Sequence, residues 1–508
     1  MIVSDKKKGG LTMRSSKITG FKRIGTALVS AGILISSAFT TSAYAAGLVT
    51  DNAELNGYVA EYMSEEHTPG LSLVAVDGDN VSYHNWGCDN IAKQIPATEH
   101  TQFEIGSTSK AFTALSVLLL QEEGKLSVND TVSDYLPWFD VKWQGESYDL
   151  KIWQLLSHTS GIPEKKTYNR VKSGTDEKLK EDTARIVEGI DLGFEPGTGY
   201  EYCNLNYDIL AYLTEVVTGE RFEDYVTREI FRPIGMNETG YDIPTAQGYQ
   251  RCLWQTIEYD APRMKGCQGD GGVITTTADM SLWIKAQLGL LTLPEKLTNA
   301  IDRSHRAENE SQYIKSSEMK DGTPLYYVNG WKMKKGAGFM VHSGGNPNFT
   351  SMIYIDRERN IGTFAVSNMA TYAPLIAAND AYKLMKGEEL APVQAAISED
   401  NIASPISAAA LILLIVIVVF MMTQKKRLAK KSVSMKKEKK LLCLRLTVFT
   451  LLLALSLTTP YLTGYNYKFA AIYLSYSVLI ALTIVDIDLI LLIVTSILRY
   501  IRQKKTDI

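Results

Sequence analysis

The distribution of apolar positions separates the chain of 508 residues into two ends and a middle. Long, nearly unbroken apolar runs lie at 24–39 and in three stretches after residue 406. Between them, short apolar stretches with the periods of strands or helices alternate with polar turns. We therefore expect a folded domain in the middle of the chain and lipid-exposed helices at its C-terminal end.

The middle region opens with a helical pattern at 52–66, which a Pro-Gly pair at 69–70 ends. Two strand-like runs follow at 71–76 and 81–86, and the residues between them, 77–80, read Asp-Gly-Asp-Asn. An Asp-Gly pair between two apolar runs is a strong signal for a β-hairpin. The domain is therefore predicted to begin with a helix and a hairpin.

Helical patterns fill the centre of this region, and strand patterns return near its end. The expected helices are 111–123, 152–157 and 206–218, the later strands are 338–342, 351–356 and 361–367, and the last helix is 374–386. Strands at both ends with helices between them predict one antiparallel sheet built from both ends of the domain, with an inserted helical lobe. The expected fold class is α/β, of the α+β kind, with two lobes and a site in the cleft between them.

The N-terminal end has the pattern of an export signal. Seven basic residues precede the apolar run at 24–39, and the small residues of Ala43-Tyr44-Ala45 follow it. This order is typical of a signal peptide, predicted at 1–45, with an uncleaved anchor helix as the alternative. Met13 is an alternative start, because the signal is complete without the residues before it. Each alternative directs the next segment out of the cytoplasm.

The C-terminal end is predicted to cross a membrane three times. The apolar runs cover 406–422, 441–457 and 469–498, and each approaches or exceeds the length of about 17 residues that a spanning helix needs. Basic residues crowd the loop 424–440 between the first two runs and also follow the third. The positive-inside rule places this loop and the C-terminus in the cytoplasm. The expected organisation is a folded domain at 46–395 outside, a linker at 396–405 and a membrane region at 406–508.

Two acidic residues, Asp486 and Asp488, interrupt the third run. An ionised carboxylate in the middle of a span costs at least about 2.5 kcal/mol. Residues that are two positions apart on a helix point to nearly opposite sides, so these two carboxylates would not share one partner. One interpretation is a polar contact or a path for a lipid-linked substrate. The other is a helix that breaks there or lies closer to the membrane surface.

Charge is divided unevenly between these regions. The chain has 53 basic and 56 acidic residues, but residues 46–423 hold 31 basic and 51 acidic ones, a net charge of −20. So acidic a domain lacks the basic surface that nucleic acids and anionic lipids require. Four cysteines in this region do not make a disulfide scaffold, and Cys252 and Cys267 are left open as a pair or as thiols. The sequence has no metal-ligand spacing, so we expect no metal.

The candidate chemistry begins with Ser107 and Lys110. A serine hydroxyl needs a base within hydrogen-bond reach, and residues three apart at the start of a helix share one face. The apolar helix that follows would bury Lys110, which lowers the pKa of its amine, and the helix N-terminus favours negative charge on Ser107. Ser-x-x-Lys alone is a frequent pattern, and an ordinary helix cap is its other interpretation.

Several segments resemble the class C β-lactamase-like serine hydrolases, a superfamily that includes penicillin-binding D,D-peptidases, D-aminopeptidases and esterases. The segments are 103–113 (FEIGSTSKAFT), 155–163 (LLSHTSGIP), 196–204 (PGTGYEYCN), 231–236 (FRPIGM) and 271–280 (GGVITTTADM). They occur in the order of that family and cover nearly the whole middle region. The resemblance implies a two-lobed β-lactamase/transpeptidase-like domain and an acyl-enzyme mechanism without a cofactor.

The resemblance also implies roles for individual residues. Ser107, Lys110 and Tyr202 would be catalytic, and Asn204 would bond the substrate amide or Lys110. The amides of Ser107 and Gly345 would form the oxyanion hole. His158 would lie in a structural turn rather than act as a base.

The strand that faces the serine departs from the family pattern. β-Lactamases carry Lys-Thr-Gly there, whereas this chain has His342-Ser343-Gly344-Gly345, and a histidine is mostly neutral at pH 7. This difference favours peptidase or esterase relatives over β-lactamases. The expected substrate-binding residues on this strand and the loop after it are His342, Ser343, Gly344, Asn346 and Asn348.

The layout of signal, hydrolase domain and three spans resembles the prodrug-activating D-amino peptidases of the colibactin-maturing type. It implies a peptidase that cleaves an amide next to a D-amino acid, with a small peptide or acyl-D-amino acid as substrate. The alternatives are a penicillin-binding-like protein, a D-alanyl esterase or weak β-lactamase of the cell wall, and a sensor that is acylated without turnover. The expected partners are membrane lipid along the spans and an exporter or a second copy of the chain.

Overall fold

The structure is a computed structural model that describes residues 53–169, 178–336, 338–390, 399–428, 434–462 and 467–506. The predicted signal peptide at 1–45 lies outside the described residues, as do 396–398 of the predicted linker and 429–433 of the predicted basic loop.

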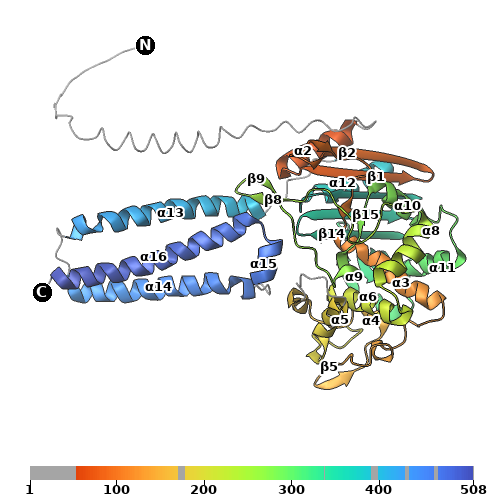
Figure 1. The fold of residues 1–508 in the computed structure, drawn as a ribbon, viewed down its shortest axis with the longest axis horizontal. Coiled ribbons are helices and arrows are strands. Elements are labelled where there is room, and N and C mark those ends of the chain that lie inside the picture. Colours follow the sequence, from red (N-terminus) through yellow and green to blue (C-terminus); the bar gives the residue numbers. More distant parts are fainter. Residues whose placement is uncertain are drawn as a thin grey trace, which may run out of the picture. The chain divides into compact units, whose positions relative to one another are not determined.

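Within the described residues, nine antiparallel strands form the main sheet, in the order β11-β12-β13-β14-β15-β16-β1-β2-β3 (Figure 1). The strands are β1 (Gly70–Asp77), β2 (Asn80–Asn90), β3 (Ile95–Pro96), β11 (Lys315–Glu318), β12 (Pro324–Val328), β13 (Trp331–Met333), β14 (Phe339–Asn346), β15 (Phe349–Asp356) and β16 (Ile361–Ser367). The predicted hairpin is β1–β2, with Asp77 paired to Asn80. Because β1 also pairs with β16, the sheet is built from both ends of the domain, which confirms the expected architecture.

Helices cover both faces of this sheet. On β1, Leu71 and Leu73 pack in a cluster with residues of α2 (Ala53–Glu66) and α12 (Ala373–Met385). The alternate residues Val74 and Val76 belong to the larger core on the other side. Successive side chains of a strand point to opposite faces, so both faces of β1 are buried, which agrees with its nearly all-apolar sequence.

As far as the structure describes it, the inserted lobe consists of helices and three small sheets. The helices between the sheet's two halves are α3 (Lys110–Glu122), α4 (Ile152–Leu156), α5 (Leu179–Ala184), α6 (Leu205–Thr218), α7 (Phe222–Val226), α8 (Arg232–Ile234), α9 (Gln268–Gly271), α10 (Thr277–Leu288) and α11 (Glu295–Ser304). The small sheets pair β4 (Phe103–Glu104) with β10 (Ile274–Thr275), β5 (Val141–Trp143) with β6 (Glu146–Tyr148) and β7 (Ile190–Asp191), and β8 (Tyr249–Cys252) with β9 (Gln255–Glu258).

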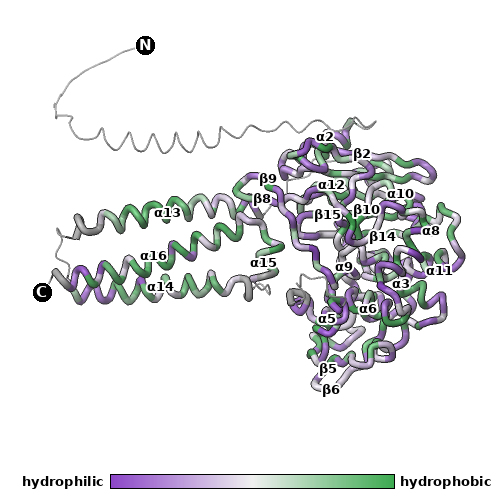
Figure 2. The backbone as a smooth tube through the Cα atoms, in the orientation of Figure 1, coloured by the Kyte–Doolittle hydropathy of each residue, from purple (hydrophilic) through white to green (hydrophobic). Residues whose placement is uncertain are grey.

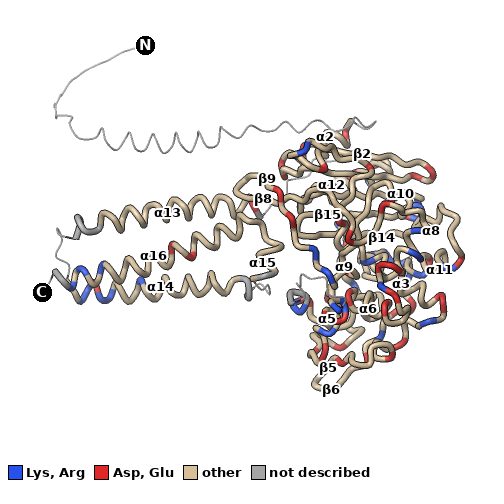
Figure 3. The backbone as a smooth tube through the Cα atoms, viewed as in Figure 1, with Lys and Arg blue, Asp and Glu red and all other residues tan. Residues whose placement is uncertain are grey.

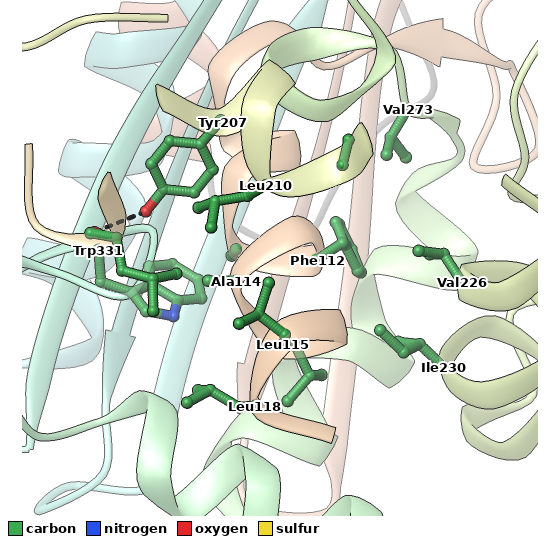
Figure 4. Close-up of a cluster of buried hydrophobic side chains, with 14 of the residues drawn as sticks. Phe112, Ala114, Leu115, Leu118, Tyr207, Leu210, Val226, Ile230, Val273 and Trp331 are labelled. Atoms are coloured by element: carbon green, nitrogen blue, oxygen red, sulfur yellow. Dashed lines mark hydrogen bonds between the residues drawn. The ribbon is translucent and has the colours of Figure 1, made fainter. Parts of the chain in front are cut away.

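Helix α3 runs through the centre of the larger core. Figure 4 shows its side chains Phe112 and Leu115 between Trp331 on one side and Ile230 on the other. The Phe112 ring lies 4.0 Å from that of Trp283, measured between centroids. Every residue from Lys110 to Leu120 is buried. The predicted helix at 111–123 is therefore confirmed, and its burial extends to Lys110.

Three helices of the C-terminal region are long and apolar enough to cross a membrane. They are α13 (Glu399–Leu428), α14 (Met435–Leu462) and α16 (Tyr476–Thr506), whose spans cover Asp400–Thr423, Met435–Thr459 and Tyr476–Lys504. Figure 2 shows the apolar residues along all three. The first helix begins inside the segment predicted as a linker.

The third apolar run differs from the prediction. Instead of one span over 469–498, the structure has a short helix, α15 (Tyr467–Tyr473), and then α16. Helix α16 continues through Asp486 and Asp488, so the interpretation of a broken helix there is wrong. Asp488 is buried, with 2% of its surface exposed.

Candidate active site

Ser107 lies in a 3₁₀ turn, η1 (Gly106–Ser109), which leads directly into α3. The turn packs closely against β14: a Cβ added to Gly106 would lie 2.5 Å from the amide nitrogen of Gly345. Gly106 also has a φ of +52°, which a residue with a Cβ rarely adopts. Glycine at 106 therefore permits both the turn and the close approach of the serine segment to Gly345.

Lys110 is fully buried beside Ser107. Its Nζ donates to Ser107 Oγ at 3.0 Å, to Asn204 Oδ1 at 2.6 Å and to the backbone oxygen of Asp270 at 2.7 Å. The Asp270 carboxylate lies 3.8 Å from the same nitrogen. Three acceptors match the three N–H groups of an ammonium, and the carboxylate offsets the cost of its burial. The amine is thus held in one position against the serine oxygen.

Tyr202 lies close to Lys110, whose Nζ is 5.0 Å from the centre of the tyrosine ring. The loop that carries Tyr202 is held by His158. The backbone oxygen of His158 accepts from the amide of Glu201 at 3.1 Å, and its Nδ1 accepts from the amide of Cys203 at 3.2 Å. The two bonds lie on either side of Tyr202, so His158 fixes the position of the residue between them.

The His158 ring is completely buried and adopts a left-handed backbone conformation, with φ of +55°. Its Nδ1 also accepts from the side chain of Asn206 at 2.9 Å, which places the ring proton on Nε2. Burial, and next the charge of Lys110, hold the pKa of His158 well below its usual value. His158 is a neutral acceptor within the loop packing, as the resemblance implied.

Asn204 connects the amine to an acidic residue that the sequence did not single out. Its Oδ1 accepts from Lys110, while its amide and its Nδ2 donate to the Glu164 carboxylate at 3.1 and 3.4 Å. Glu164 directly follows the recognised segment 155–163, and Asp270 directly precedes the segment 271–280. Their proximity to those segments was the only sequence signal, because both meet Asn204 or Lys110 through the tertiary fold.

The β14 strand divides its residues between two faces. The His342 side chain points inward, with 3% of its surface exposed; its Nδ1 donates to the Ser343 oxygen at 2.7 Å, and its Nε2 accepts from Tyr327 Oη at 2.9 Å. Burial, and next the charge of Lys110, lower the pKa of His342 to about 3. Ser343 and Gly345 are exposed. A neutral, buried His342 brings no positive charge to the open face of the strand.

Gly344 and Gly345 differ in their surroundings. A Cβ on Gly344 would lie 1.9 Å from the backbone oxygen of Ile105, whereas a Cβ on Gly345 would meet no atom within 4 Å. Gly344 therefore allows β14 to pack against the segment before Ser107. Gly345 leaves open space beside the serine.

Asn346, the last residue of β14, and Asn348, in the turn after it, have different partners. Asn346 donates to the Glu104 carboxylate at 2.5 Å and to the Gly271 oxygen at 3.4 Å. Asn348 is buried, and its Nδ2 donates to the backbone oxygen of Tyr259 at 2.8 Å. Burial raises the pKa of Glu104, against the opposite effects of Asn346 and Arg263. Asn346 thus lies at the site, while Asn348 ties the loop to the chain near β9.

A pocket of about 130 Å³ opens on this arrangement. The predicted site residues that line it are Ser107, Asn204, Gly345 and Asn346. Lys110 donates hydrogen bonds to two of them, Ser107 and Asn204. The remaining charged residues of the lining are Glu104, Glu164, Asp242, Asp270, Arg263 and Lys265. One pocket thus brings together a hydroxyl, a buried amine and an open glycine strand. This is the arrangement of a nucleophilic acyl-transfer site.

A family model described as Beta-lactamase matches residues 55–384 of the chain. The chain belongs to the beta-lactamase family. Membership agrees with the geometry, because the matched range includes every residue of the pocket except those contributed by α15. The protein is accordingly a beta-lactamase-family protein, and three long apolar helices follow the matched range among the described residues.

Two relatives of this beta-lactamase-family protein are Protein flp of Staphylococcus aureus (strain N315) and Penicillin-binding protein 4* of Bacillus subtilis (strain 168). The first is 28% identical over 336 residues, which cover 64% of this chain and 65% of the relative. The second is also 28% identical, over 329 residues, 59% of this chain and 69% of the relative. The chain thus spans just under two thirds of the length of the staphylococcal relative.

A solved structure with the same fold is the octameric penicillin-binding protein homologue from Pyrococcus abyssi. Its TM-score is 0.58 at 24% identity, over 67% of this chain and 78% of that chain. The likeness confirms the expected β-lactamase/transpeptidase-like α/β fold.

Two expectations concern groups away from the nucleophile. Cys252, in β8, and Cys267, before α9, are not joined by a disulfide. Among the described residues, no three His, Cys, Asp or Glu side chains gather into a group that could hold a metal ion. The expectation of a mechanism without metal stays a prediction.

Proposed function

We propose that the protein is a membrane-anchored, extracytoplasmic serine peptidase that cleaves an amide next to a D-amino acid. The observation that carries the proposal is the buried Lys110 amine 3.0 Å from Ser107 Oγ, at the end of a pocket. Three helices of spanning length anchor the domain, and Figure 3 locates the basic residues of α14 and α16 at one end of these helices. By the positive-inside rule, that end faces the cytoplasm and the catalytic domain lies outside.

In the proposed first half-reaction, Ser107 Oγ forms a bond to the substrate carbonyl carbon while its proton passes to the phenolate of Tyr202, whose charge the nearby Lys110 ammonium stabilises. The amides of Ser107 and Gly345 stabilise the oxyanion. The C–N bond then breaks as the base returns the proton to the leaving amine. Water attacks the acyl-enzyme in the same way, and the acid leaves with Ser107 restored.

The charges around the pocket support an amide without a free carboxylate beside it. His342 is buried and neutral, so it does not replace the cation that binds the carboxylate of a β-lactam or of a terminal D-alanine. Four carboxylates and two basic side chains make up the other charged groups of the lining, and one of the basic ones, Arg263, pairs with Glu104. An acylated D-residue with an uncharged side chain fits this lining better than an anion does.

A second candidate is a D,D-carboxypeptidase of the penicillin-binding type. The observation that favours it is the similarity to Penicillin-binding protein 4*, together with the Ser107–Lys110 pair.

The test uses full-length protein in phosphatidylcholine vesicles, with Ser107→Ala and the surface variant Ser133→Ala as matched serine changes. We expect a fluorophosphonate probe to label the wild type and Ser133→Ala but not Ser107→Ala, which loses at least about 10³-fold in rate. N-acyl-D-asparaginyl amides should be cleaved faster than their L-isomers and faster than D-alanyl-D-alanine peptides or D-alanyl esters.

Three results would contradict this proposal. Equal labelling of Ser107→Ala would exclude Ser107 as the nucleophile. Faster release of terminal D-alanine would select the carboxypeptidase, and stoichiometric labelling by every substrate without turnover would indicate a sensor.

A further inference from the structure

The turn between β8 and β9 carries two large apolar side chains on the surface of the family domain. Cys252 pairs with Gln255, so the turn consists of Leu253 and Trp254. Their exposed fractions are 36% and 49%. Trp254 is the only exposed one of the seven tryptophans of the chain, all of which lie within the described ranges. Two adjacent apolar side chains of this size contribute little to the domain core, so their exposure points to a contact outside it.

The backbone of this turn, called here the 253–254 turn, is strained. The φ angles are +49° at Leu253 and +67° at Trp254. A two-residue hairpin turn with positive φ at both positions is normally Asn-Gly, because a Cβ raises the energy of the left-handed region. The two apolar side chains therefore occupy the turn at a cost to the stability of the domain, and such strain is concentrated in functional segments.

Two hydrogen bonds fix the 253–254 turn at the level where the long apolar helices begin. The Leu253 amide donates to Ser477 Oγ at 2.7 Å, and the Trp254 amide donates to a carboxylate oxygen of Asp400 at 3.3 Å. Asp400 is the first residue of the candidate span in α13, and Ser477 is the second residue of the span in α16. The exposed apolar surface of α13 begins at Ile402, two residues after Asp400. The turn thus lies where both helices pass into their apolar part.

The tip of the hairpin is uncharged. Residues 252–255 include no Asp, Glu, Lys or Arg. Arg251, directly before them, forms a pair with Asp400 at 3.1 Å in which the side chains are 11% and 1% exposed. Glu258 lies at the opposite end of the hairpin, where it pairs with Tyr249. A neutral tip with an indole ring suits the boundary between lipid and water, where tryptophan is enriched, better than it suits water.

We propose that the 253–254 turn inserts into the surface of the bilayer beside α13 and α16, so that the β8–β9 hairpin is a membrane contact of the family domain. Trp254 lies among the lipid headgroups, and Leu253 lies against the upper part of the acyl chains. Transfer of the two side chains from water into this region offsets the strain of the turn. The inference rests on the proposed anchoring of the three helices in a membrane and does not depend on the chemistry at Ser107.

The hairpin connects this contact to the active site. Tyr259 directly follows β9, and its backbone oxygen accepts from Asn348 at 2.8 Å. Asn348 lies in the turn after β14, the strand that carries Gly345. Because the hairpin is bonded to the serine strand at one end and rests on the bilayer at the other, it sets the distance between the Ser107 pocket and the lipid.

The experiment measures the quenching of tryptophan emission by phosphatidylcholine that is brominated near the carbonyl end of its acyl chains. Full-length wild type, Trp254→Phe and Trp138→Phe are compared in vesicles with and without the brominated lipid. Bromine quenches indole only at short range, so the loss of emission reports contact with acyl chains. Trp138 is half-buried in the inserted lobe, where the Arg185 guanidinium lies 4.2 Å from its ring, and its variant controls for the loss of one tryptophan.

A second pair of variants tests the apolar neighbour and keeps Trp254 as the reporter. Leu253→Asn places at the turn a polar residue that tolerates positive φ. Val216→Asn is the matched control, because Val216, in α6, is also apolar and 44% exposed.

We expect brominated lipid to lower the emission of the wild type by about one seventh, the share of one tryptophan in seven. The loss should be similar in Trp138→Phe and absent in Trp254→Phe. Leu253→Asn should be quenched less than the wild type, because the turn loses an apolar group that favours insertion, and Val216→Asn should match the wild type.

Quenching that persists in Trp254→Phe would overturn the inference, as would quenching of Leu253→Asn at the wild-type level. Quenching of Trp254 by iodide in the water instead of by lipid would show that the turn faces solvent. Protection of Trp254 from both quenchers would show that another protein chain covers it, and either result would also overturn the inference. In all these cases the protein still floats with the vesicles and the proposed function stands. Protein that does not float with vesicles would overturn the proposed anchoring, and the inference with it.

Discussion

At the scale of single residues, Gly106 decides how closely the segment of Ser107 approaches Gly345 of β14. Gly106 precedes Ser107, and the position of its missing Cβ is 2.5 Å from the Gly345 amide that is proposed to bind the oxyanion. Replacing Gly106 by alanine should move that amide away from the serine, and a displacement of 1 Å can cost about 10²-fold in rate. His158 acts at the same scale, since its two bonds on either side of Tyr202 position that ring.

We expect Gly106→Ala to lower the rate of Ser107 labelling by a fluorophosphonate at least about tenfold. Gly124→Ala is the matched control: Gly124 has a φ of +72°, so alanine meets a similar backbone strain of about 1–2 kcal/mol, but its Cβ would have no atom within 4 Å. Labelling of Gly106→Ala at the rate of Gly124→Ala would show that the contact with Gly345 has no role in the reaction.

At the scale of elements, β12 and β14 enclose a histidine that the folded protein keeps neutral. His342 has its pKa lowered to about 3 and accepts from Tyr327 of β12. In the unfolded chain its pKa returns to about 6.5, so between these values only the unfolded state binds the proton. The stability of the folded state must therefore fall as the pH drops below about 6.5, by about 1 kcal/mol per pH unit. His305, whose pKa burial also lowers to about 3, adds a second contribution of the same sign.

The measurement is the melting temperature of the detergent-solubilised protein from pH 7 to pH 4. We expect His342→Gln, which keeps a hydrogen-bonding side chain without a titrating ring, to reduce the slope. His100→Gln is the control, because the hydrogen bond that this exposed histidine donates to the Glu238 carboxylate raises its pKa and gives its contribution the opposite sign. A slope unaltered by His342→Gln would mean that His342 titrates normally in the folded state.

At the scale of the whole molecule, the beta-lactamase-family domain and the apolar C-terminal helices are joined through buried polar groups. Asp400 of α13 meets Arg251 of β8 and Ser477 of α16, so one carboxylate connects α13 to two other elements. Removing either member of a buried pair leaves the other charge without compensation, at a cost of about 3–5 kcal/mol.

We therefore expect Asp400→Ala and Arg251→Ala each to lower the melting temperature of the full-length protein strongly. The double variant should lose less than the sum of the two, because it leaves no unpaired charge behind. As a comparison, Lys315→Ala and Glu318→Ala disrupt an exposed pair and should change the melting temperature little. Strict additivity of the Asp400 and Arg251 effects would show that the pair does not couple the two parts.

Much of the fold was predictable because it depends on local patterns. The hairpin at 77–80, the apolar helix after Ser107 and the strands of residues 351–367 follow from the periods of their side chains, and each is confirmed within one or two residues at most positions. The boundary between α15 and α16 was not predictable, because Leu474 and Ser475 interrupt the run without a proline, a glycine or a charge. Only the contacts of Ser477 and Leu474 with the β8–β9 hairpin distinguish the two helices.

The sequence by itself determined that Ser107 and Lys110 share a face, because three residues make one turn, and that three apolar helices follow the domain, because length and apolarity are local properties. Tertiary structure alone decided which groups surround them. Asp270 reaches Lys110 from 160 residues away, and Glu164 reaches Asn204 from 40 residues away. It also turned His342 away from the pocket and brought Phe469 and Tyr473 to its edge, since pairing between strands and packing between distant helices fix those positions.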